Sequence, residues 1–99
     1  MPNPKFCQSY RGAIVGLVKN IPVDKELAAQ AQQVVETLTE EGVTGDALDR
    51  VTAAAAARQQ ALQDDYAQIK AFMDEYQNDL GCGDPYDIPG VRGLDIPPD

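Results

Sequence analysis

Residues 44–80 read TGDALDRVTAAAAARQQALQDDYAQIKAFMDEYQNDL and contain no proline. Thr44 is a good helix N-cap, Asp46 lies in the first turn behind it, and Gly81 is a natural helix stop. A mostly apolar stripe recurs every three or four residues, as on one side of a helix. It consists of Leu48, Val51, Ala55, Arg58, Leu62, Tyr66, Ile69, Met73, Tyr76 and Leu80. We expect one long helix over residues of about 45–80.

A second helix is predicted over residues of about 24–41. Asp24 is its N-cap candidate, and Gly42 follows where a left-handed C-terminal cap is expected. Its apolar positions again fall on one side of a helix. They are Leu27, Ala31, Val34, Val35 and Leu38.

The N-terminal region is expected to be broken by prolines. Pro2 and Pro4 favour an extended arm over residues 1–7. A short helix over residues of about 8–20 comes next, and Pro22 then forces a break or a kink before the second helix.

The two main helices are predicted to form an antiparallel hairpin that turns at Gly42–Thr44, so that the numbers of facing residues sum to about 86. If the short helix over residues of about 8–20 continues roughly in line with the second helix, every pair of facing residues is apolar or aromatic. Chance matching of two amphipathic stripes is the alternative. The predicted pairs are Leu38 with Leu48, Val35 with Val51, Ala31 with Ala55, Leu17 with Ile69, and Tyr10 with Tyr76. We therefore expect an all-α fold with a hairpin domain over residues 1–80.

The hairpin register brings Cys7 and Cys82 to the same end of the molecule, within about one helical turn of each other. A disulfide between them is geometrically allowed and would indicate an oxidising setting or an extracellular particle. Two separate thiols, one of them packed beneath Phe6, are the alternative.

Residues 81–99 are rich in glycine and proline and carry excess acid, so we expect an extended tail rather than a helix or a central strand. We expect the tail to be held either by the body of its own chain or by a neighbour. Its two apolar-Asp-Ile-Pro copies are expected to dock on a partner, and chance repetition in a biased sequence is the alternative. The copies are Tyr86, Asp87, Ile88, Pro89 and Leu94, Asp95, Ile96, Pro97.

Composition excludes several classes of protein. The chain has no histidine and a formal net charge of -8, so histidine-based catalysis, zinc sites of mixed Cys/His type and nucleic-acid binding are not expected. The carboxylate pairs Asp64–Asp65 and Asp74–Glu75 point apart on a helix and do not form a catalytic or metal site. We expect no enzymatic activity, no cofactor and no metal. No apolar stretch is long enough to span a membrane.

A single hairpin of 99 residues buries little apolar surface, which indicates that other protein subunits cover the rest. We expect a structural or assembly protein, a small multi-copy subunit held in a larger oligomeric complex by its terminal arms. A minor virion structural protein of a tailed phage, in the tail, baseplate, connector or capsid decoration, fits this description. The alternative is a small acidic inhibitor or regulator that binds a basic protein surface.

Overall fold

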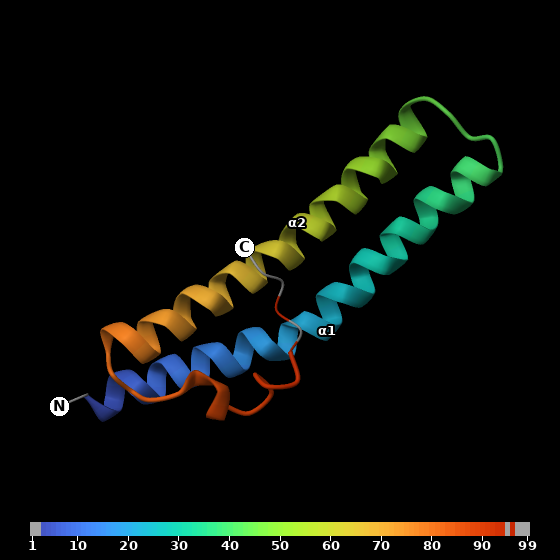
Figure 1. The fold of residues 1–99 in the computed structure, drawn as a ribbon. Coiled ribbons are helices and arrows are strands. Elements are labelled where there is room, and N and C mark those ends of the chain that lie inside the picture. The colour runs from blue at the N-terminus through green and yellow to red at the C-terminus, as the bar shows by residue number, and fades with distance from the viewer. Residues whose placement is uncertain (1–2, 95, 97–99) are drawn as a thin grey trace. The chain divides into compact units, whose positions relative to one another are not determined.

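A computed structural model describes residues 3–94 and 96 of the chain. Their regular elements are α1 (Pro4–Glu40), α2 (Asp46–Asp74), the π-helical turn η1 (Glu75–Asp79) and the 3-10 turn η2 (Pro85–Asp87). Figure 1 shows α1 and α2 joined by a short loop. The described residues contain no strand, and the predicted all-α helical hairpin is confirmed.

The chain divides into two compact units. Unit 1 is formed by residues 1–21 and 65–99, and unit 2 by residues 22–64. Each unit pairs a stretch of α1 with a stretch of α2. Unit 1 also contains the segment that follows α2, which we call the tail (residues 81–99).

Helix α1 begins at Pro4, so the predicted extended arm over residues 1–7 is wrong from that residue onward. Asn3 explains the early start, because its side-chain Oδ1 accepts a hydrogen bond from the Lys5 backbone N–H at 2.9 Å. Its carbonyl also accepts from the Cys7 N–H at 3.1 Å. Asn3 is therefore an N-cap, and Pro4 occupies the first helical position, where proline is favoured.

Of the break or kink predicted at Pro22, the break is wrong, because α1 continues through this residue. The separate helix over 8–20 and the N-cap at Asp24 are therefore not present. Pro22 costs the helix one backbone hydrogen bond, but its side chain is exposed. Ile14, Ile21 and Ala28 follow one another at intervals of seven residues and are all buried.

The loop between the helices is built on two glycines with left-handed backbones. Gly42 has φ +79°, and the Val43 N–H donates to the Leu38 carbonyl at 2.9 Å, which confirms the predicted C-terminal cap. Gly45 has φ +82°, and its carbonyl accepts from the Asp49 N–H at 3.0 Å. Gly45 rather than Thr44 therefore precedes α2.

Unit 1 has a core of three layers. The side chains with the least exposure in the described chain are Ile14, Ile21, Ile69, Ile88 and Val91, and all of them belong to this unit. The first two come from α1, the third from α2, and the last two from the tail. The tail therefore serves as a third layer, which lets this unit bury large branched side chains.

Unit 2 has only two layers and a much smaller core. Its buried apolar residues are Ala28 of α1 and Ala55 of α2. Alanines let two helices approach closely, but they leave little volume to bury. The seam is the line along which the two helices face each other. Its longer residues are only half-buried, because no third layer of the described chain covers them; they are Val35, Leu38, Leu48 and Val51.

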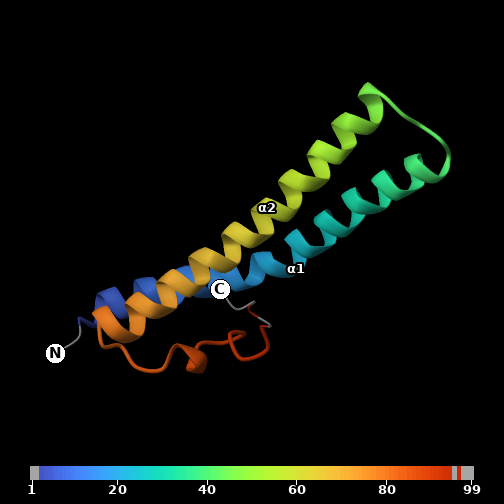
Figure 2. The same cartoon turned by 45° about the horizontal axis from the view of Figure 1, so that its top comes forward.

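The tail lies close against the N-terminal part of α1, as Figure 2 shows. Gly90 has φ +88°, and a Cβ atom at this position would lie 2.8 Å from Cγ1 of Val18. The backbone at Gly90 therefore requires glycine for two reasons: its conformation and its distance from the helix.

Replacing Gly90 by alanine tests this close approach. We expect Gly90→Ala to lower the free energy of unfolding by about 1–3 kcal/mol, because the new methyl group meets Val18 and the backbone is strained. Urea denaturation followed by circular dichroism measures the change. Gly93→Ala is the matched control, since a Cβ there meets nothing within 4 Å. Equal stability of the two variants would contradict the packing described.

Candidate functional site

The first copy of the tail repeat does not project as a free arm. Ile88 is 1% exposed within its own chain, whereas Tyr86 and Pro89 are exposed. Asp87 forms a salt bridge with Arg92 of the same tail, in which Arg92 Nη2 lies 3.2 Å from Asp87 Oδ1. Ile88 therefore anchors the tail to its own unit, and the prediction that this side chain fills a partner's pocket is corrected.

The second copy of the repeat is only partly described. Leu94 and Ile96 are half-buried, while Asp95 and Pro97 lie outside the described residues. Sequence reasoning missed Val91, which is fully buried between the two copies. Its signal was an apolar residue three positions after Ile88, which places both on the same side of a turn-rich segment.

In unit 1, side-chain hydrogen bonds join the N-terminal part of α1 to the turn η1. The Tyr10 hydroxyl donates a hydrogen bond to Oε2 of Glu75, and Arg11 Nη1 donates to the Tyr76 hydroxyl at 3.4 Å. The residue numbers of these pairs sum to 85 and 87, on either side of the predicted 86. Tyr10 also packs edge-on against Phe72, with ring centroids 5.5 Å apart.

Not every predicted seam position is the most buried one. In α1 of unit 1, Leu17 is half-buried, whereas its neighbour Ile14 is fully buried. Ile69, the predicted partner of Leu17, is fully buried as well.

A disulfide joins Cys7 and Cys82, whose Cα atoms are 5.7 Å apart. It links the first turn of α1 to the start of the tail. The π-helical turn η1 ends the helix just before Cys82. Its hydrogen bond from the Leu80 N–H to the Glu75 carbonyl, at 2.8 Å, spans five residues instead of the four of an α-helix. Within unit 1, the disulfide thus joins the beginning of α1 to the residues that follow η1.

The predicted seam of unit 2 lies between its two helices. Ala55 is buried, and its predicted partner Ala31 is half-buried, as are Val35, Val51, Leu38 and Leu48. Sequence reasoning missed Ala28, which is the most buried residue that α1 contributes to this unit. Its position seven residues before Val35 was the available signal.

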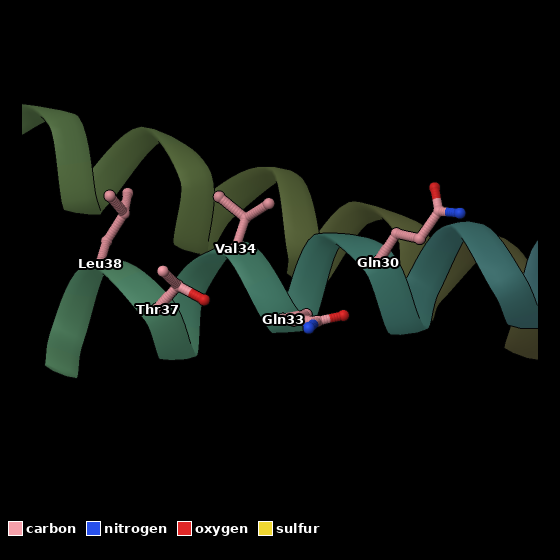
Figure 3. A pocket seen from close by; sticks show the side chains of 5 residues that line it. All are labelled: Gln30, Gln33, Val34, Thr37 and Leu38. Carbon is pink, nitrogen blue, oxygen red and sulfur yellow. The ribbon is translucent and has the colours of Figure 1, made fainter.

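One side of α1 in unit 2 carries a hollow of about 400 Å³. It is lined by Gln30, Gln33, Val34, Thr37 and Leu38. Figure 3 shows Gln30, Val34 and Leu38 in one row along the helix. Val34 is 47% exposed, and Val23 on the same helix is 57% exposed. The hollow therefore belongs to an exposed helix surface with apolar and amide side chains.

The middle of unit 2 is also free of charge. Residues 27–35 of α1 and 51–57 of α2 contain no acidic or basic side chain, although 24% of the chain is charged. The predicted register places these two stretches at the same height of the hairpin. We call them together the uncharged band. Its exposed side chains are alanine, glutamine, threonine and valine.

Residues 3–94 and 96 contain no group of three or more Cys, Asp or Glu side chains placed to hold a metal ion. In the same part of the chain, neither helix is long and apolar enough to cross a membrane. No family model, curated protein or solved structure matches this sequence.

The hydroxyl of Tyr10 is expected to ionise late. Its hydrogen bond to Glu75 raises the pKa above the ordinary value of 10.0, and desolvation and the negative charges of Glu75 and Asp79 act in the same direction. The folded-state pKa therefore lies above the unfolded one. The stabilisation that this hydrogen bond provides is complete below about pH 10 and is lost as the pH rises through the folded-state pKa.

A spectroscopic titration checks the environment of Tyr10. We expect the phenolate absorption of the native protein to include one late step, which is missing in Tyr10→Phe. Glu75→Gln should move that step to lower pH, because it removes the neighbouring charge but keeps the side chain's shape. An unchanged titration curve in Glu75→Gln would contradict this account.

Reduction tests the contribution of the disulfide. The bond spans a sequence separation of 75 residues. A closed loop of this length constrains the unfolded chain, so Cys7→Ser combined with Cys82→Ser should lower the free energy of unfolding by about 4 kcal/mol. Urea denaturation with and without reductant measures it. Reductant should destabilise the native chain and have no effect on the double variant; equal effects on both would oppose this assignment.

Proposed function

We propose that this chain is a non-enzymatic structural or assembly protein, a small subunit that binds other protein subunits. The binding surface in this proposal is the exposed side of unit 2 that includes the hollow and part of the uncharged band. The tail has a different role from the one expected at first: it completes the core of its own unit.

One observation carries the proposal, and it is the contrast between the two units. Unit 1 has a third layer and buries isoleucine and valine side chains fully. Unit 2 lacks such a layer, buries two alanines, and leaves Val23 and Val34 about half exposed. A helical hairpin in this condition gains stability when another protein supplies the missing layer.

The chemistry of the side chains supports a binding role rather than catalysis. The chain has no histidine, and both of its cysteines are joined in the disulfide. The hollow is lined by amide, hydroxyl and aliphatic side chains, which offer hydrogen bonds and apolar contact but no nucleophile poised beside a base.

A virion is the setting that we propose for this role, with the chain as a minor structural component of a tailed-phage particle. The Cys7–Cys82 disulfide supports this setting, because such bonds persist in extracellular particles and in other oxidising surroundings. Small subunits that contribute one surface to a larger assembly are typical of such particles.

Site-specific photo-cross-linking tests the proposed role. A photoreactive amino acid at Gln30, which lines the hollow, should form a covalent adduct with a defined protein when the chain is expressed in its native setting. Mass spectrometry of the adduct identifies the protein. The matched control is the same amino acid at Gln32, an exposed residue that points to the other side of α1.

The two positions separate the outcomes. Adducts at Gln30 and few at Gln32 would support a protein-binding role for this surface. Equal adducts at both positions, or no protein adduct at Gln30, would contradict it.

A further inference from the structure

We propose that the partner of unit 2 is a second copy of this chain, and that two copies pair through the exposed side of their hairpins to form a four-helix arrangement. This inference rests on the proposed function and names the partner for that surface. Three properties of the surface point to a second copy: its continuity, its lack of acidic side chains, and its area.

Both helices of unit 2 contribute to the same side. On α1, the residues one position before the seam are Val23, Leu27, Gln30, Val34 and Thr37. On α2, the residues one position before the seam are Ala47, Arg50, Ala54, Ala57 and Ala61. In an antiparallel pair, one step back along the chain turns both helices toward the same side of the hairpin. The two rows therefore form one continuous face, which we call the small-residue face.

The opposite side of unit 2 has a different character. One position after the seam, α1 presents Ala29, Gln32, Glu36 and Thr39, and α2 presents Asp49, Thr52, Ala56 and Gln63. All of these side chains are exposed, and the charged ones among them suit contact with water. The small-residue face thus differs from the other side by its valines and leucine and by the hollow beneath Val34 and Leu38.

Charge favours a second copy over a partner of another kind. Each copy carries a formal charge of -8, so two copies repel unless their acidic side chains stay away from the contact. The small-residue face meets this condition, because its rows contain no acid. A basic partner would have no carboxylate to bind there.

The side chains are also complementary to themselves, as a two-fold interface requires. A glutamine amide both donates and accepts hydrogen bonds, so Gln30 can pair with an equivalent glutamine across the contact. Alanines on α2 let a second pair of helices approach closely.

The size of the face fits a dimer of modest affinity. Two helices set 8–10 Å apart give a width of about 20 Å, and residues 23–41 span about 27 Å along the axis. Each copy would therefore bury roughly 500–600 Å², close to the lower limit of stable protein interfaces.

Sedimentation equilibrium of the purified, disulfide-bonded chain tests this inference. We expect a monomer–dimer equilibrium over a roughly thousandfold range of concentration. Val34→Glu and Ala54→Glu each place a carboxylate in the contact, and each should raise the dissociation constant by roughly a hundredfold. The matched controls, Gln32→Glu and Ala56→Glu, add the same charge on the opposite side and should change it by less than about threefold.

Salt and helix content are measured in parallel. Added salt should leave the dimer intact or strengthen it, because it screens the repulsion between two acidic chains. Circular dichroism checks that each variant is folded. If Val34→Glu loses helix, Gln30→Glu places a charge in the same row and replaces it.

Three results would overturn the inference: a monomer at every concentration, equal weakening by the test and control variants, or dissociation by salt. These results differ from a failure of the proposed function. A chain that stays monomeric but forms an adduct with another protein at Gln30 keeps its binding role and loses only the second-copy partner. An adduct of twice the chain mass supports both.

Discussion

The largest fully buried side chains of the described chain all lie in the unit where the tail adds a third layer to the two helices, and this layer organises the core. In unit 1 the tail provides that layer: Ile88 and Val91 are buried there together with Ile14, Ile21 and Ile69. In unit 2 no segment of the described chain does so, and the buried positions are alanines. The same pair of helices thus has a complete core in one unit and an open one in the other.

The ends of the chain strengthen the complete unit. The disulfide ties the first turn of α1 to the start of the tail, and Gly90 lets the tail backbone approach Val18. Asp84 and Arg92 stabilise the turns within the tail, since Asp84 Oδ1 accepts from the Tyr86 N–H at 2.9 Å and Arg92 Nε donates to the Tyr86 carbonyl at 3.0 Å. A segment rich in glycine and proline is ordered here by packing and covalent attachment rather than by regular secondary structure.

The open unit has the composition of a contact surface. Its helices lack charge in the middle, although the chain as a whole is strongly acidic. Alanine and glutamine are good helix formers, so the helices persist without a large core of their own. This combination leaves a helix surface that is stable enough to be presented and apolar enough to be covered, which is the physical basis of the proposed assembly role.

The sequence by itself determined the hairpin, because the three-four spacing of α2 and the glycines near the turn specify two helices and their register within one residue number. It also brought both cysteines to one end. It did not reveal that α1 is continuous, since local rules place a break or a kink at Pro22, whereas the helix runs through this residue. Only the tertiary structure decided where the tail lies. An Asp-Ile-Pro copy can bind its own chain or another, and here the burial of Ile88 and Val91 places the tail on its own unit.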